Sequence, residues 1–259
     1  MWSTPKAITR GSVETRAADA RLLAEQSAEP KHGRIYDLEE LWENFEYFMR
    51  AVVPVAEEVG VKLSLHPNDP PVNIIAGVPC LITSKAAYDR AYAIAASISP
   101  THTLGMEFCC GCWLEGGQID DASAYHPGFG NIYEALPAFI EDRRVNIVHF
   151  RNISSPLPAF DETFIDDGCT AVLCRPLCCA ARATTDQPSL RADGDMYLLI
   201  RNMVRAGYDG SIILDHTPSF EEFAGGHDGA TSYAVGWIKG AIRAAQFEMR
   251  LEGSPQASL

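Results

Sequence analysis

The sequence contains no apolar run that approaches the roughly 20 residues needed to span a bilayer. Residues 1–26 also include no apolar segment as long as the core of a signal peptide. Both absences argue against a membrane protein and against a secreted one. We therefore expect a soluble, cytoplasmic protein without a membrane partner.

Basic runs are missing as well. The chain has 34 acidic and 21 basic residues, a formal charge of -13, and no cluster of Lys and Arg that could follow a phosphate backbone. Nucleic acid is therefore not an expected partner. An acidic surface also repels anionic substrates at long range, so such a substrate would need a local cation, either a metal ion or a buried Arg.

The eight cysteines are clustered rather than spread along the chain. So many thiols could form disulfides, but without a secretion signal the clustering favours reduced thiols, some of which hold a metal ion. The two groups are Cys109, Cys110 and Cys112, and then Cys169, Cys174, Cys178 and Cys179.

With 259 residues, of which 47% are hydrophobic, the chain is long enough to bury the core of one domain. From Asp37 onward, stretches of helical periodicity alternate with short apolar runs, which is typical of an α/β fold. We expect helices at 37–60, 85–98, 132–142, 196–206 and 230–250, and strands at 61–66, 103–109, 145–150 and 211–216.

Each expected strand ends in a residue that can bind a metal ion: His66, Cys109, His149 and Asp215. The carboxyl ends of the strands form the catalytic face of a parallel α/β barrel, so these side chains would converge there. A single His or Asp at a strand end is more often a turn or capping residue. Four such residues in successive units indicate a shared site.

The number of strands is small for the length of the chain. A complete eight-stranded barrel occupies about 250 residues, whereas four convincing strands are present. We therefore predict a single α/β domain, 1–259, with a TIM-barrel-type parallel sheet, outer helices and an incomplete, half-barrel form. An N-terminal arm, 1–34, has no clear strand, and 168–192 has the composition of a Cys-rich surface insertion.

A half barrel exposes the face that would line the barrel interior, together with its strand edges. The N-terminal arm, the insertion or another subunit must therefore cover this face. We favour another subunit, and so we expect a homo-oligomer.

Four motifs surround the strand ends. Prolines stiffen the turn in LSLHPNDPP, and LDHTPSF supplies Asp215. In MEFCCGCW, Cys109 and Cys110 cannot both point into one site if the strand continues through them, because strand side chains alternate between faces. HFRN sets Arg151 two residues after His149, where it could clamp a carboxylate or make a structural ion pair.

These motifs, with FDE at 160–162 and GDMYLLIRNMVRAGYDG between them in the same order, resemble the mannonate dehydratases, which are xylose-isomerase-like metal TIM barrels. The resemblance implies one divalent ion, Mn²⁺ or Fe²⁺, bound by His66, Cys109, His149 and Asp215. A mixed imidazole, thiolate and carboxylate set does not by itself distinguish these metals from zinc.

The resemblance also implies a lyase of sugar-acid catabolism, in glucuronate degradation, which removes water from D-mannonate to give 2-keto-3-deoxy-D-gluconate. A proton leaves the carbon next to the carboxylate and a hydroxyl leaves the following carbon, so a base and an acid are needed. His216, beside the ligand Asp215, is the candidate acid or base. Substrate contacts are expected from Arg151, which would pair with the carboxylate, and from Asn152, Asp69 and Glu162.

Three segments depart from the family pattern. Asn68 stands where the family has an aspartate, and Cys80 follows the Gly-Val-Pro turn where an arginine is common. The family's catalytic tyrosine has no clear counterpart in AGGHDGATSYAVGWIKG. Either His227 substitutes for it or that function is absent, because Tyr233 is expected inside a helix.

Two other functions compete with the lyase. One is a metal-dependent sugar isomerase or epimerase that acts on a neutral substrate. The other is a catalytically impaired barrel fragment that retains the metal site. The half-barrel form and the altered tyrosine segment favour it. Arg151 and the ordered motifs favour the lyase.

Overall fold

The computed structural model describes residues 6–9, 12–26, 30–117, 128–167 and 195–253. The predicted insertion at 168–192 lies outside the described residues. No helix in the described part of the chain combines the length and apolarity that a membrane crossing requires.

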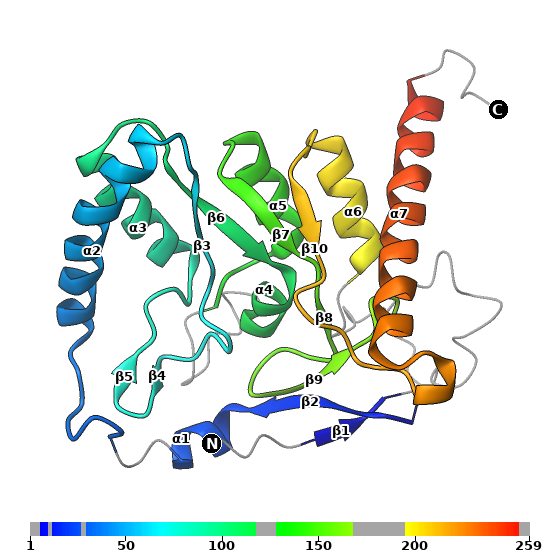
Figure 1. Cartoon of the computed structure of the whole chain (residues 1–259), viewed down its shortest axis with the longest axis horizontal. Helices are drawn as coiled ribbons and strands as arrows, with labels where there is room; N and C mark the ends of the chain where they lie inside the picture. The colour runs from blue at the N-terminus through cyan, green and yellow to red at the C-terminus, as the bar shows by residue number, and fades with distance from the viewer. Residues whose placement is uncertain (1–5, 10–11, 27–29, 118–127, 168–194, 254–259) are drawn as a thin grey trace.

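A parallel sheet of four strands occupies the centre of the molecule (Figure 1). Its strands follow the order β10-β7-β6-β3, and each neighbouring pair is parallel. The predicted α/β class and the four parallel strands are therefore confirmed, although the two outer strands are shorter than expected. The strands are β3 (Leu63–Leu65), β6 (Leu104–Cys109), β7 (Val145–His149) and β10 (Ser211–Ile213).

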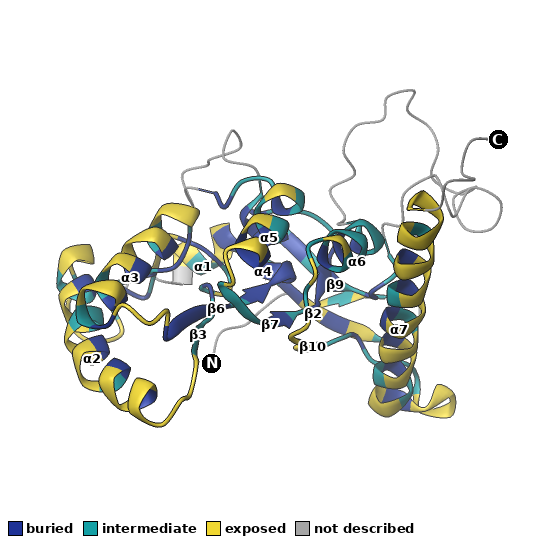
Figure 2. Cartoon of the chain, turned by 90° about the horizontal axis from the view of Figure 1, so that it is seen from above, coloured by how far each residue is buried: buried dark blue, intermediate teal, exposed yellow. Residues whose placement is uncertain are grey.

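Five long helices alternate with these strands, and side chains cap the starts of several of them. The side chain of Asp37 accepts a hydrogen bond from Glu39 N, and that of Ser84 accepts one from Ala87 N. Figure 2 shows α3, α5 and α6 on the same side of the parallel sheet. The helices are α2 (Leu38–Glu58), α3 (Lys85–Ile98), α5 (Ile132–Glu141), α6 (Met196–Arg205) and α7 (Gly226–Glu252).

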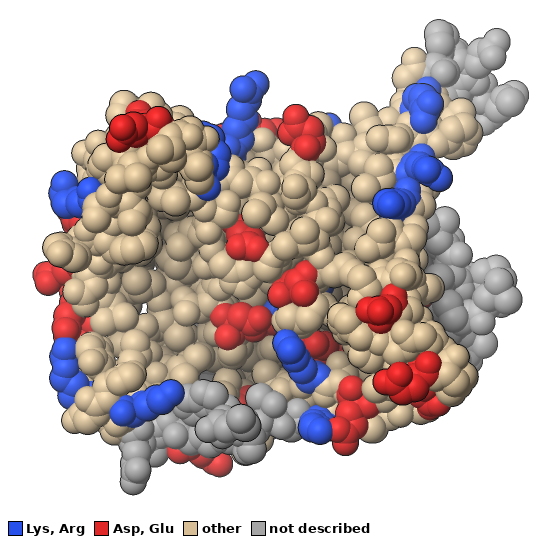
Figure 3. All heavy atoms as spheres, in the orientation of Figure 1, with Lys and Arg blue, Asp and Glu red and all other residues tan. Residues whose placement is uncertain are grey.

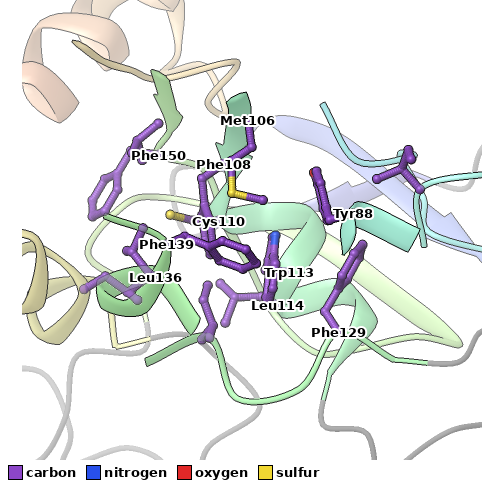
Figure 4. Close-up of a cluster of buried hydrophobic side chains, with 14 of the residues drawn as sticks. Tyr88, Met106, Phe108, Cys110, Trp113, Leu114, Phe129, Leu136, Phe139 and Phe150 are labelled. Atoms are coloured by element: carbon purple, nitrogen blue, oxygen red, sulfur yellow. The ribbon is translucent and has the colours of Figure 1, made fainter. Parts of the chain in front are cut away.

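An aromatic cluster joins β6 to the helices (Figure 4). Trp113, on the short helix α4 (Cys110–Gly116), stacks on Phe108 with ring centroids 4.7 Å apart and on Phe129 at 4.8 Å. All three side chains are buried. The packing fixes α4 directly behind the end of β6, and therefore fixes the position at which Cys109 leaves the strand.

The expectation that the N-terminal arm has no strand is wrong. The arm forms β1 (Lys6–Ile8) and β2 (Glu14–Asp19), followed by α1 (Ala20–Gln26). Strand β2 pairs with the distant β9 (Ala159–Thr163), which continues to β8 (Asn152–Ile153) in an antiparallel sheet. Figure 1 shows β1 and β2 running below the carboxyl ends of the parallel strands.

The strands of the arm escape detection for a physical reason. The segment ETRAAD of β2 has a single β-branched residue and buries Thr15 and Ala17 on one face only. Strand β2 pairs with β9, which lies far along the chain, so the sequence around β2 does not by itself predict a strand. The remaining elements are the hairpin β4 (Ile74–Ile75) and β5 (Val78–Pro79), and η2 (Glu222–Ala224).

The two outer strands of the parallel sheet, β3 and β10, have no further strand beside them among the described residues. Ile213 of β10 keeps 45% of its surface exposed. The arm pairs with β9 and not with either of these edges. A second subunit at the exposed face therefore stays a prediction.

Candidate metal centre

The carboxyl ends of the parallel strands bring four potential ligands together. His66, Cys109, His149 and Asp215 each offer a donor atom, and these atoms lie within 4.8 Å of one another. Register explains the convergence, because Cys109 of β6 pairs directly with His149 of β7, which also faces Ile213 of β10. His66 follows β3 by one residue, and Asp215 follows β10 by two.

Both histidines have one ring nitrogen engaged by the protein. Nδ1 of His66 lies 2.6 Å from the backbone carbonyl of Pro67. Nε2 of His149 contacts the carboxylate of Glu107, and its Nδ1 is buried without a hydrogen-bond partner, 3.6 Å from Asp215 Oδ2. An outer contact of this kind sets the tautomer and orientation of a metal-binding imidazole.

Glu107 was not among the residues expected at the site. It lies two residues before Cys109 on β6, and strand alternation puts both side chains on the same face of the sheet. That spacing, together with a carboxylate inside an otherwise apolar strand, could have indicated from the sequence that Glu107 belongs to the site. The contact with His149 could not be read from the sequence, because it depends on the pairing of β6 with β7.

The three neighbouring cysteines have different surroundings. Burial raises the pKa of Cys109, but contacts with Cys112, His149 and His66 and the charge of Arg151 outweigh it and hold the pKa well below its ordinary value. Cys110 begins α4 and is buried in the hydrophobic core. Burial raises the pKa of Cys112 well above its ordinary value, and its sulfur lies near Asp69 and Glu115 and not among the four ligands. Of the three, Cys109 is therefore the thiol that belongs to the candidate metal centre.

Two other members of the set also favour cation binding. Burial lowers the pKa of His149, but the adjacent Asp215 and Cys109 outweigh it and raise the pKa to about 10. Asp215 has a left-handed backbone with φ of 62°, which non-glycine residues adopt rarely and mainly where surrounding structure requires it. Its carboxylate is thereby turned toward His149 and Cys109.

Arg151 lies in the centre of an acidic group and not at the surface. Its side chain is 2% exposed, and Nη2 donates to Glu115 at 2.5 Å and to Asp69 at 3.1 Å. Nη1 lies 3.6 Å from Glu162, and Nε lies 3.4 Å from Asp215. These contacts are those of the structural ion pair, the alternative that the sequence left open.

Acidic groups surround Arg151. Four carboxylates and the Cys109 sulfur lie around the guanidinium, and Nη2 also approaches the Cys109 and Cys112 sulfurs at 4.0 and 3.5 Å. Burial raises the pKa of Glu115 and of Asp69, although the charge of Arg151 opposes this shift. Thiolate, imidazole and carboxylate donors together could hold a divalent transition metal ion.

Asn152 is also a structural residue. It is 1% exposed, and its amide donates to the carbonyls of Phe164 and Asp167 while its oxygen accepts from Ile153 N. No polar atom of the side chain remains for a substrate. The structure therefore gives no support to the expected substrate contact from Asn152.

Three of the remaining candidates meet at a cavity of about 330 Å³, which none of the four ligands lines and which is linked to them through the contact of His216 with Asp215. His216 and Glu162 line it, with His216 Nδ1 2.7 Å from Glu162 Oε1 and His216 Nε2 3.4 Å from Asp215 Oδ2. His227, on the first turn of α7, lines the same cavity. Four residues of the N-terminal arm also line it and were not expected there: Lys6, Glu14, Thr15 and Arg16.

A substitution at Gly111 tests how tightly Arg151 is packed. An added Cβ would lie 2.4 Å from Arg151 Nε, and the guanidinium is fixed by its carboxylate partners. We expect Gly111→Ala to lower the free energy of unfolding by about 1 to 3 kcal/mol, the usual cost of overpacking. Gly240→Ala is the matched control, since its Cβ meets nothing within 4 Å and alanine favours a helix. Chemical denaturation that finds both variants as stable as the parent would contradict this packing.

Comparison with known proteins places these residues in a family. Residues 18–170 match the family model described as D-mannonate dehydratase (UxuA). Mannonate dehydratases of Streptococcus agalactiae serotype Ia and Lactococcus lactis subsp. cremoris are 32% and 31% identical over 180 residues. Each alignment covers 70% of this chain but 41% and 40% of the relative, so the chain spans about two fifths of their length.

The crystal structure of mannonate dehydratase from Streptococcus suis serotype 2 is similar in fold. The TM-score is 0.61 at 22% sequence identity, over 100% of this chain and 65% of that one. This likeness concerns the fold alone. The family model, by contrast, matches more than half of the 259 residues. The chain belongs to the D-mannonate dehydratase (UxuA) family.

Proposed function

We propose that the chain binds one divalent ion, Mn²⁺ or Fe²⁺, through His66, Cys109, His149 and Asp215, and that it dehydrates D-mannonate to 2-keto-3-deoxy-D-gluconate. The observation that carries the proposal is the convergence of four donor atoms within 4.8 Å. The outer contacts of both histidines and the lowered pKa of Cys109 support a cation at this point.

The reaction requires one proton to leave the carbon beside the carboxylate and another to join the departing hydroxyl as water. A divalent ion supplies stabilisation of the negative charge that develops on substrate oxygens. His216 suits the transfer of a proton, because it lines the cavity and lies between Glu162 and Asp215. His227 lines the same cavity and is the candidate for the second proton transfer.

Three acidic or basic neighbours have supporting roles in this proposal. Glu162 holds one nitrogen of His216, and Asp69 lies 3.1 Å from Arg151 Nη2. Arg151 holds these carboxylates around the ligands. It is buried among them, and we therefore assign it to positioning and not to the substrate carboxylate.

The exposed edges of the parallel sheet also bear on the oligomeric state of the protein. We infer that the parallel sheet is an arc of a barrel and that a second copy of the chain covers its inner face. The unpaired outer sides of β3 and β10 within the described residues and the exposure of Ile213 support this inference.

An activity assay with parallel metal binding tests the proposed function. With Mn²⁺, the purified chain should convert D-mannonate to a 2-keto-3-deoxy acid, and a chelator should abolish the reaction. His149→Ala should lower Mn²⁺ affinity by more than about 100-fold, beyond the loss typical of an outer-contact change. The exposed His32→Ala is the matched control.

The outcomes separate the competing functions. Metal binding without turnover would favour the impaired fragment. Turnover of a neutral sugar in place of the acid would favour an isomerase or epimerase. Absence of metal binding by the parent chain would overturn the proposal. The molecular mass of the active species would show whether two copies of the chain assemble.

Glu107 provides an independent test of the metal centre. Its contact holds Nε2 of His149, which leaves Nδ1 for the ion. Glu107→Gln weakens this contact with little change in size, so we expect Mn²⁺ affinity to fall by about 10- to 100-fold in calorimetry. Glu141→Gln, an exposed change at the end of α5, should leave it unaltered. Equal affinities for all three proteins would show that Glu107 does not orient the ligand.

A further inference from the structure

We propose that Lys6 and Arg16, which lie side by side on β1 and β2, bind the carboxylate of the sugar-acid substrate. The inference rests on the proposed function and identifies the group that recognises the acid. It also gives the N-terminal arm a role at the site. The pair is called the arm cations below.

The arm cations are direct neighbours across a strand pair. Lys6 is the register partner of Arg16 in the antiparallel pairing of β1 with β2. Directly opposed side chains point to the same face, with Cβ atoms about 4.5 to 5.5 Å apart. Two like charges in this arrangement repel each other. An anion placed between them would remove that repulsion.

The existing contacts balance only one of the two charges. Lys6 forms an ion pair with Glu14 of the neighbouring strand. Arg16 is exposed and forms no ion pair with any residue that the structure describes. A guanidinium presents two parallel N–H groups that match a carboxylate, so a free Arg16 can bind a planar anion in a bidentate manner.

The arm cations line the same cavity as the candidate catalytic residue His216. Both line the cavity of about 330 Å³ that His216, Glu162 and His227 also line, together with Glu14, the partner of Lys6. A ligand in this cavity could therefore contact Arg16 with its carboxylate while its adjacent carbons lie near His216. Figure 3 shows basic side chains interspersed among acidic ones toward the lower right of this face, below the parallel sheet.

Charge explains why a dedicated cation is needed. The chain carries a formal charge of -13, which disfavours the approach of a sugar acid. Arg151 cannot supply the cation, because its side chain is 2% exposed and its nitrogens already face carboxylates of the protein. A neutral sugar would leave Arg16 unpaired, so the arm cations would also select acids over neutral sugars.

Kinetics with the Mn²⁺-loaded chain test the assignment. Arg16→Ala should raise the KM for D-mannonate by about 10- to 100-fold, the loss expected for a charged hydrogen-bonded contact, while Mn²⁺ affinity stays unchanged. Arg16→Lys should recover part of the loss, since it keeps the charge without the planar fork. Arg243→Ala, an exposed change on α7, is the matched control and should leave KM unaltered.

Binding without turnover separates this inference from the proposed function. D-mannonate binding is measured by calorimetry in Mn²⁺-loaded His216→Ala, with and without Arg16→Ala, and D-mannose serves as the neutral ligand. We expect weaker D-mannonate binding in the double variant. Binding of D-mannonate that is equally tight in both would overturn the role of Arg16. Failure of His216→Ala to bind D-mannonate at all would overturn the proposed function and this inference with it.

Discussion

The parallel pairing of β6 with β7 sets Cys109 beside His149, and the arrangement of the site depends on that register. A shift by one residue would turn every side chain of a strand to the opposite face of the sheet. Cys109 would then point into the hydrophobic cluster, and Glu107 would leave His149. The aromatic packing of Trp113 against Phe108 and Phe129 holds α4 behind β6 and so stabilises the register.

Electrostatics divides the cations of the site into two kinds. Arg151 is buried, and its partners are carboxylates and sulfurs of the protein itself. Arg16 is exposed, lines the cavity and has no ion pair within the described part of the chain. A buried cation that loses its partners is costly, which suits Arg151 to holding the ligands in place. An accessible one can exchange water for a substrate carboxylate.

Local patterns in the sequence predicted the parallel sheet and the positions of the helices. Helical periodicity is a property of neighbouring residues, and so are the apolar runs that end in His66 or Asp215. The sequence separated Cys109 from Cys110 only on the condition that the strand continues through both; instead β6 ends at Cys109 and α4 begins at Cys110, which lies in the core.

Long-range pairing could not be predicted in the same way. Strand β2 carries a single β-branched residue and is recognisable only beside β9. The arm cations were missed for the same reason, because their proximity to His216 depends on that pairing. The sequence likewise left two roles open for Arg151, since burial and the number of facing carboxylates arise only in the folded chain.

The identity of the sulfur ligand tests the central claim most directly. X-ray absorption at the manganese edge should detect one sulfur among nitrogen and oxygen neighbours in the Mn²⁺-loaded chain. Cys109→Ser should remove the sulfur signal, whereas Cys112→Ser should retain it. A spectrum without sulfur, or a signal that depends on Cys112 in place of Cys109, would contradict the metal centre described above.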